Sequence, residues 1–157
     1  MSALPQSVPT AHGKSYLSVM VNADRIAWIP FVLPGTFWKP LYLDDDSGGA
    51  TFLLKVPLGH SAAKHKHFAY VEAYVVQGGF SYPNEGAVAQ GDYIREPGGA
   101  VHEPVSEGTE DLILFVVARS GIQGVNPDGS LGSVLDNDVL YECATSGNQH
   151  HHLRQKR

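Results

Sequence analysis

The sequence predicts a single all-β domain made of short strands, arranged as a sandwich or a barrel. The length of 157 residues, at 16.9 kDa, is typical of one domain. Seventeen Gly and ten Pro are spread along the chain and divide it into pieces of strand length. Helical periodicity is hard to find beyond short stretches, which leaves strands as the main element.

The expected strands are runs rich in β-branched and aromatic residues. They lie at about Ile26–Leu33, Phe37–Leu43, Ala50–Val56, His67–Val76, Ala87–Arg95, Leu112–Ala118 and Val139–Ala144. Turn residues separate them, at Pro34–Gly35, Asp44–Gly49, Gly78–Gly79, Pro83–Gly86, Pro97–Gly99 and Pro127–Gly129. Many short strands at regular spacing are typical of sandwiches and barrels.

The two ends of the chain are less patterned than its middle. Residues 1–24 are expected to form an N-terminal segment that is flexible or packs on a partner subunit, residues 25–145 the barrel, and residues 146–157 a flexible tail. We expect a homodimer or a homotetramer, because open sheet edges are often covered by a second subunit.

Composition and charge exclude several classes of function. A net charge of −5 with scattered Lys and Arg disfavours nucleic-acid binding. No run of eighteen apolar residues exists and residues 1–24 lack the pattern of a secretory signal, so we expect a soluble, cytoplasmic protein without membrane contact. Cys143 is the only cysteine, which excludes an intrachain disulfide and a Cys-based zinc site.

A histidine pair at the start of a predicted strand indicates a metal site. His65 and His67 are separated by one residue, so in a strand both imidazoles lie on one face. Imidazole binds Fe, Zn, Cu and Ni, and His102 after a Gly-rich turn is the obvious third ligand. An H-x-H triplet alone is a weak signal, and its context decides its meaning.

That context resembles the two motifs of the cupin superfamily. Gly59, five residues, His65-x-His67, four residues, Glu72, six residues and Gly79 fit the first motif. Gly91, five residues, Pro97-x-Gly99, two residues and His102 fit the second, except that Ser106 stands where the family usually has Asn. The resemblance implies a single-domain cupin, a double-stranded β-helix or jelly-roll barrel, with a metal on His65, His67 and His102.

Glu72 is a possible fourth ligand, which we disfavour. Counted along the strand from His67, Val71 lies on the inner face and Glu72 on the outer face unless a bulge intervenes. If Gly78 rather than Gly79 is the turn glycine of the motif, the position of the ligand carboxylate is taken by Val71. We therefore favour a three-histidine centre.

A closer resemblance points to an activity. Trp38–Leu41, Gly91–Gly99 and Asp111–Phe115 are similar to the 2,4'-dihydroxyacetophenone dioxygenases, and more loosely to acetylacetone dioxygenase and to the cupin half of anti-sigma factors of the ChrR type. The first likeness implies a non-haem Fe(II) enzyme that cleaves the carbon–carbon bond of an aryl hydroxymethyl ketone with O2, giving an aromatic carboxylate and formate. A Zn-binding sensor without turnover, an isomerase, or a different oxygenase that uses Mn or Ni stays open.

Two further residues are predicted near the metal. Glu96 precedes His102 by six residues and could orient a ligand imidazole, although an exposed carboxylate at a strand end is equally consistent. Tyr82 could direct its hydroxyl toward a substrate oxygen or be an ordinary barrel aromatic. His60 is interpreted as a surface residue, and His150–His152 as an incidental run in the tail.

Overall fold

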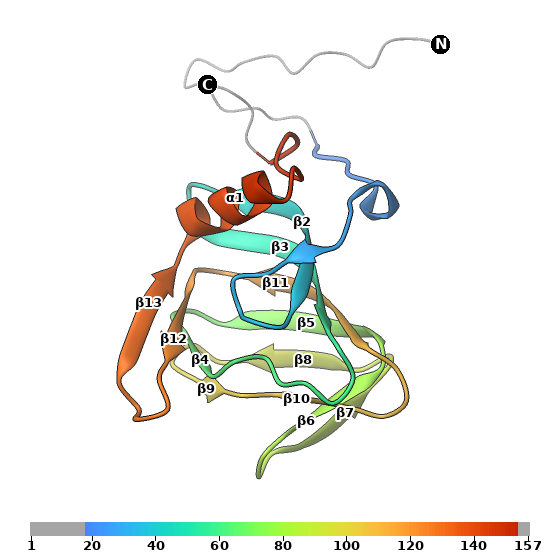
Figure 1. Cartoon of the computed structure of the whole chain (residues 1–157), viewed down its shortest axis with the longest axis vertical. Helices are drawn as coiled ribbons and strands as arrows, with labels where there is room; N and C mark the ends of the chain where they lie inside the picture. The colour runs from blue at the N-terminus through green and yellow to red at the C-terminus, as the bar shows by residue number, and fades with distance from the viewer. Residues whose placement is uncertain (1–17, 154–157) are drawn as a thin grey trace.

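The computed structural model describes residues 18–153 (Figure 1). Its elements are η1 (Ala23–Arg25), β1 (Ile29–Pro30), β2 (Phe37–Asp44), β3 (Gly49–Val56), β4 (His65–His67), β5 (Val71–Gln77), β6 (Gly79–Tyr82), β7 (Gly86–Ala89), β8 (Tyr93–Glu96), β9 (Val101–His102), β10 (Val105–Glu107), β11 (Leu112–Ala118), β12 (Ile122–Val125), β13 (Leu131–Leu135) and α1 (Asn137–Ser146).

The strands form three antiparallel sheets that together enclose a barrel (Figure 1). The largest sheet has the order β1-β2-β3-β11-β5-β8, and the others have the orders β10-β6-β7 and β13-β12-β4-β9. β11 lies between β3 and β5 although both precede it in the chain, so strands distant in sequence are neighbours at the centre of this sheet. The prediction of a single all-β barrel is confirmed.

The barrel core is mainly aliphatic and includes a cluster of three aromatic residues. β11 shows the alternation that produces it: Leu112, Leu114 and Val116 are buried while the residues between them are more exposed. Phe31, Trp38 and Phe52 contact one another with ring centroids 5.1 to 5.8 Å apart. Aromatic side chains supply a large buried area, so this cluster anchors β2 and β3 on the segment that follows β1.

Several predicted strands differ from the structure in length. The run His67–Val76 is two strands, β4 and β5, with a bend between them, and Ala87–Arg95 is likewise divided into β7 and β8. Within Ile26–Leu33 only Ile29–Pro30 is a strand. Five short strands, β6, β9, β10, β12 and β13, were not predicted, because runs of two to five residues carry too little periodicity.

The prediction of a strand at Val139–Ala144 is wrong, because these residues belong to α1. Asp136 caps this helix, its side chain accepting from the backbone N–H of Asp138 and Val139. The helix crosses the boundary expected after residue 145, and Leu153 beyond it is 5% exposed. Residues 146–153 therefore pack on the barrel, and residues 154–157 and 1–17 lie outside the described residues.

Among residues 18–153, no helix has the length and apolar content that crossing a bilayer requires.

Candidate metal centre

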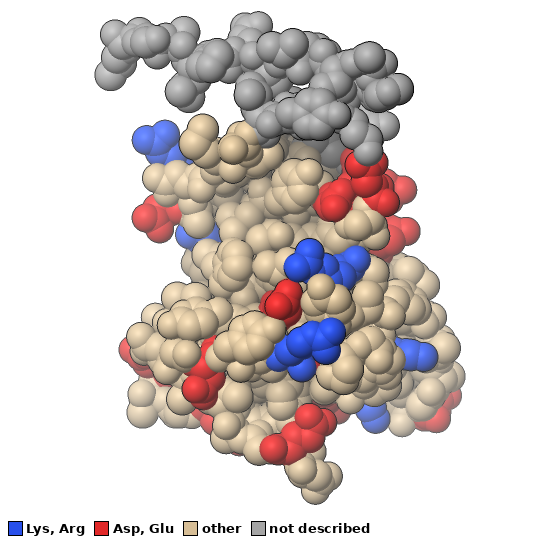
Figure 2. All heavy atoms as spheres, turned by 180° about the vertical axis from the view of Figure 1, so that it is seen from behind, with Lys and Arg blue, Asp and Glu red and all other residues tan. Residues whose placement is uncertain are grey.

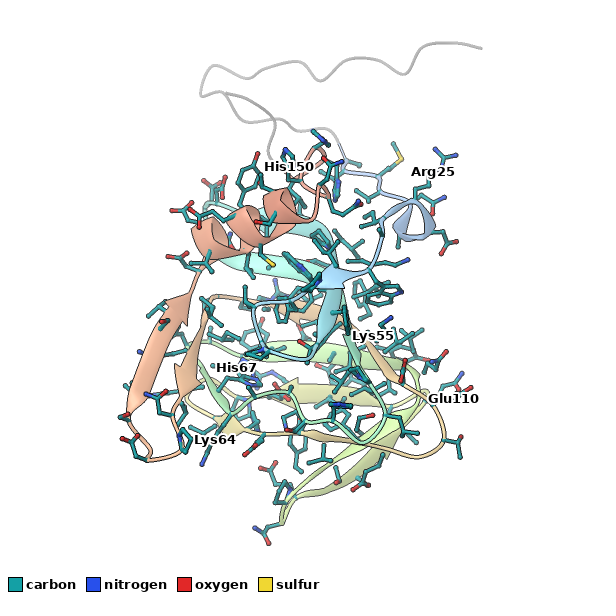
Figure 3. All side chains as sticks on the ribbon, viewed as in Figure 1. Arg25, Lys55, Lys64, His67, Glu110 and His150 are labelled. Atoms are coloured by element: carbon teal, nitrogen blue, oxygen red, sulfur yellow. The ribbon has the colours of Figure 1, made fainter. Side chains whose placement is uncertain are left out.

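The two histidines of the H-x-H triplet point into the barrel from β4. His65 and His67 are 6% and 5% exposed, and Lys66 between them is more exposed, as strand alternation requires. β4 is only three residues long, but it lies between β9 and β12, which pair with it on both sides. Figure 3 shows His67 inside the barrel wall.

His102 reaches the same space from β9. Its Cα pairs with that of His65 across the β4–β9 ladder, and the side chain is 7% exposed. The turn before β9 is held against the histidine strand, because Gly99 N–H donates to His67 O at 2.8 Å and His67 N–H donates to Ala100 O at 3.1 Å. A Cβ on Gly98 would lie 3.1 Å from Phe68 O, so this close approach favours glycine.

The ligand atoms of His67, His102 and Glu96 form one cluster, all within 4.8 Å of one another. His65 adjoins it, its ring centroid 4.8 Å from that of His67. The structure thus brings the three predicted histidines together and adds Glu96, which was expected to act on a ligand from outside. Glu96 Oε2 is 2.7 Å from Nε2 of His67, and the Glu96 side chain is 16% exposed.

The donor set fits a divalent transition metal. Nδ1 of His67 and Nε2 of His102 are buried and have no hydrogen-bond partner among the described residues, and such atoms are costly unless something binds them. His65 donates from Nδ1 to Ala63 O at 2.7 Å, which leaves its Nε2 lone pair free. Burial lowers the pKa of His65 to about 4, so its imidazole is neutral near pH 7 and able to bind a cation.

Glu96 connects the histidines to Tyr82. Tyr82 donates its hydroxyl to Oε1 of Glu96, and its ring centroid lies 4.8 Å from that of His102. Burial alone would raise the pKa of the Glu96 carboxyl, but the contact with His67 and the proximity of His102 and His65 hold this pKa below its usual value. An ionised carboxylate and a phenol hydroxyl therefore lie side by side at the metal centre.

Glu72 lies on the outside of the barrel. Its carboxylate accepts hydrogen bonds from Tyr93 Oη at 2.8 Å and from Arg119 Nη2 at 3.3 Å. These partners lower the pKa of Glu72, and its side chain is 32% exposed. Val71, its neighbour, is buried. Glu72 is therefore not positioned to be a fourth ligand in this arrangement.

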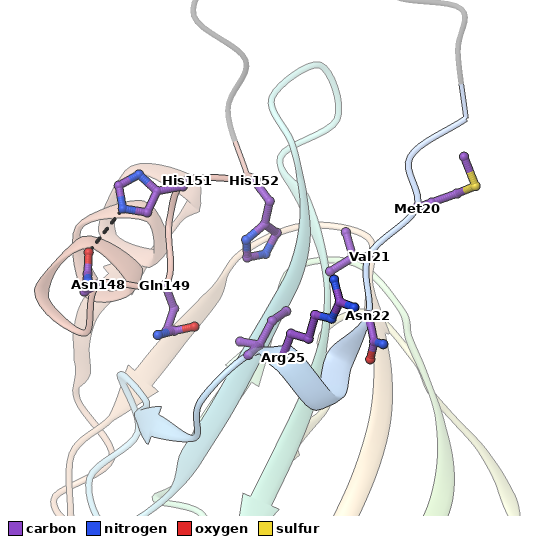
Figure 4. A pocket seen from close by; sticks show the side chains of 9 residues that line it. Met20, Val21, Asn22, Arg25, Asn148, Gln149, His151 and His152 are labelled. Carbon is purple, nitrogen blue, oxygen red and sulfur yellow. Dashed lines mark hydrogen bonds between the residues drawn. The ribbon is translucent and has the colours of Figure 1, made fainter. Parts of the chain in front are cut away.

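The remaining histidines of the described residues are away from this centre. His60 is exposed. His151 and His152 contribute to a surface hollow beside residues 20–26 (Figure 4). There His151 Nε2 contacts Asn148 Oδ1 at 3.2 Å and His152 Nε2 contacts Pro40 O at 2.8 Å. Within residues 18–153, His150–His152 form no cluster of three ligand atoms.

Comparison with known proteins gives the family. Residues 17–120 match the family described as the ChrR cupin-like domain. The chain belongs to this cupin family. The cupin resemblance inferred from the two motifs is confirmed, and so is the fold. No curated protein sequence matches this cupin significantly.

Solved structures show the same fold at low sequence identity. An RmlC-like cupin from Ralstonia eutropha has a TM-score of 0.76 at 22% identity, covering 88% of this chain and 91% of that one. An acetylacetone dioxygenase from Acinetobacter johnsonii has a TM-score of 0.72 at 14% identity, with 93% and 99% covered. The anti-sigma factor ChrR of Rhodobacter sphaeroides, bound to SigE, gives 0.52 at 22% identity, with 62% and 50% covered.

Sequence reasoning did not connect Tyr82 to Glu96. These residues come from β6 and β8, which belong to different sheets, so no local pattern brings them together. The role of β12 was also missed: Gly124 and Ile122 pair with His65 and His67 and thereby hold the histidine strand in place. A Gly-containing run of four residues gives no clear strand signal.

Proposed function

We propose that this cupin is a non-haem Fe(II) dioxygenase that cleaves the carbon–carbon bond of an aryl hydroxymethyl ketone with O2. The products are an aromatic carboxylate and formate, and the two oxygen atoms of O2 account for the additional oxygen of these products. The observation that carries the proposal is the buried cluster of imidazole donors, with one carboxylate and one phenol hydroxyl beside it.

The histidines would hold the metal. Three imidazole ligands would leave an iron ion room for a bidentate oxygen ligand and O2. Fe(II) held there would supply Lewis acidity toward the substrate's oxygens and the electron transfer that O2 activation requires. His65 is fixed in one tautomer by Ala63 O, which leaves its Nε2 lone pair able to bind a cation.

Glu96 would accept a proton from the substrate, and Tyr82 would donate a hydrogen bond to it. A hydroxyketone binds more tightly when its hydroxyl is deprotonated, so a carboxylate close to the ligands is in place to accept that proton. Once Glu96 is protonated, Tyr82 can donate its hydroxyl hydrogen bond to a substrate oxygen instead.

The test is anaerobic reconstitution of the metal-free protein with Fe(II), followed by measurement of O2 uptake. With 2,4'-dihydroxyacetophenone as the substrate, one carboxylic acid and one formate are expected per O2. His60→Ala and Glu72→Gln are matched controls, because they change a histidine and a carboxylate outside the cluster, and both should retain turnover.

The second candidate is cleavage of a β-diketone, which binds through two oxygens in the same way. It is favoured by the fold that this chain shares with the acetylacetone dioxygenase of Acinetobacter johnsonii. O2 uptake with acetylacetone, and none with the hydroxyketone, would assign the protein to β-diketone cleavage. Stoichiometric Zn(II) binding without O2 uptake on either substrate would indicate a sensor and contradict the enzymatic proposal.

A further inference from the structure

A surface hollow of about 380 Å³ lies at the α1 end of the barrel, where two segments far apart in the chain meet (Figure 4). Residues 20–26 form one side of the hollow, and residues 148–152, which follow α1, form the other. Figure 3 shows Arg25 at this end of the molecule, away from His67 inside the barrel. The hollow is therefore separate from the metal centre.

Two amide side chains of the hollow offer hydrogen-bond donors, because their oxygens are already in use. The backbone N–H of Asp24 donates to Oδ1 of Asn22 at 2.9 Å, and the backbone N–H of Ala27 donates to Oε1 of Gln149 at 3.2 Å. A backbone N–H can only donate, so these two contacts fix which end of each amide is the oxygen. The NH2 groups of Asn22 and Gln149 have no hydrogen-bond partner among the described residues, which leaves them able to bind a ligand.

Arg25 gives the hollow a positive charge without a partner. Its side chain is exposed and makes no ion pair with any described residue, and no Asp or Glu of the described part of the chain lines the hollow. Residues 1–17 and 154–157 contain no Asp or Glu either, so these segments hold no acidic side chain that could neutralise it. On the face seen in Figure 2 basic and acidic residues are interspersed, so the hollow itself, and not a broad basic surface, would attract an anion. A guanidinium group and free amide donors are suited to an oxyanion.

The hollow also has an apolar wall. Met20 is 79% exposed there, and Val21 and Ile26 line the same side. Apolar side chains with a few convergent polar groups are typical of sites for small organic molecules. One guanidinium group matches a single negative charge, whereas a phosphate group carries nearly two near pH 7. The charge and the apolar wall together favour an organic carboxylate over a phosphate.

We propose that this hollow binds the carboxylate group of a small organic acid. Arg25 and the NH2 groups of Asn22 and Gln149 donate to the carboxylate oxygens, and Met20 packs against the apolar part of the acid. Because the hollow is open to water, we expect a dissociation constant of about 1 mM for an acid of the size of benzoate. The proposal does not depend on the metal or on the reaction.

The experiment is an NMR titration of the full, nitrogen-labelled chain with sodium benzoate, with circular dichroism to check that each variant is folded. In the wild type the side-chain NH2 signals of Asn22 and Gln149 should shift. Arg25→Gln should weaken binding by about 10-fold or more, because hydrogen bonds between charged groups are among the strong ones. The matched control is Arg95→Gln, which removes an exposed arginine on β8 and should bind benzoate as the wild type does.

An isosteric change tests the amide donors without altering the shape of the hollow. Gln149→Glu keeps an oxygen for the N–H of Ala27, but it replaces the NH2 donor by an oxygen that shares a negative charge. Benzoate binding should then be lost. Benzyl alcohol, a neutral molecule of similar size, should bind the wild type about 10-fold more weakly than benzoate does, because it lacks the charge.

Three results would overturn the proposal. One is the absence of shifts at Asn22 and Gln149 up to about 20 mM benzoate, including the case in which benzoate binds only after removal of residues 154–157. Another is benzoate binding that Arg25→Gln and Gln149→Glu leave unchanged. The third is a hollow that binds benzyl alcohol as tightly as benzoate, or that binds inorganic phosphate and not benzoate.

Discussion

Replacement of Glu96 by Gln tests whether the negative charge of Glu96 contributes to metal affinity. The change keeps the size of the side chain and an acceptor for Tyr82, but it removes the negative charge 2.7 Å from Nε2 of His67. All ligand atoms of the cluster lie within 4.8 Å of one another. A carboxylate about 5 Å from a dication attracts it by about 7 kcal/mol at an effective dielectric constant of about 20.

Most of this attraction is offset, because the carboxylate must also give up water. A partner that contacts a ligand typically contributes about 10 to 100-fold in metal affinity, and we expect Glu96→Gln to fall in that range. A larger loss would indicate that Glu96 binds the metal directly. Competition with a chromophoric chelator, using Fe(II) without oxygen or Zn(II), measures the dissociation constant.

The matched control is Glu72→Gln. Its carboxylate is on the outer face, bonded to Tyr93 and Arg119, so the metal affinity should stay within about twofold. Equal loss of affinity in both variants, or loss only in Glu72→Gln, would refute the reasoning, because the barrel would then have to turn Glu72 inward.

Three other perturbations follow from the same geometry. His65→Ala, His67→Ala and His102→Ala should each abolish stoichiometric metal binding measured by elemental analysis, while circular dichroism stays that of a folded barrel, because the core does not rest on a metal as a zinc finger does. The pKa of His65 is about 4 in the folded protein and about 6.5 in the unfolded chain. Between these two pH values the unfolded chain carries a proton on His65 that the folded protein lacks. The metal-free protein should therefore lose about 2 kcal/mol of unfolding free energy from pH 7 to pH 5, and urea titrations should show this contribution absent in His65→Gln and present in His60→Gln. Leu153→Ala should lower the unfolding free energy by about 2 kcal/mol in the same assay, and an unchanged midpoint would mean that residues 146–153 do not pack as described.

The part of the site that the sequence predicts is the part encoded by short-range spacing. His65 and His67 share a face because they are two residues apart on a strand, and this holds whatever the strand pairs with. Likewise Pro97–Gly99 has turn residues that act locally, which places His102 in the short strand that follows. Glu72 was expected outside, and it lies there even though the continuous strand assumed for that argument is broken between β4 and β5.

What the sequence does not predict depends on partners that are far apart in the chain. Glu96 approaches His67 because β8 and β4 come together around the barrel, and neither strand carries a local sign of it. The helix α1 was missed for a different reason. Val139, Leu140 and Tyr141 suggest a strand, whereas the cap at Asp136 is the signal that would have predicted a helix.

The position of β4 in its sheet determines when the metal centre can form during folding. The strand with His65 and His67 has its two neighbours at residues 101–102 and 122–124, so the stretch from residue 65 to residue 124 must come together before the histidines are fixed. Closing such long loops is slow compared with forming local turns. A metal ion therefore cannot template this fold from a small nucleus. It is expected to enter a finished barrel, so that the rate of loading is governed by opening of the barrel wall and not by refolding of the chain.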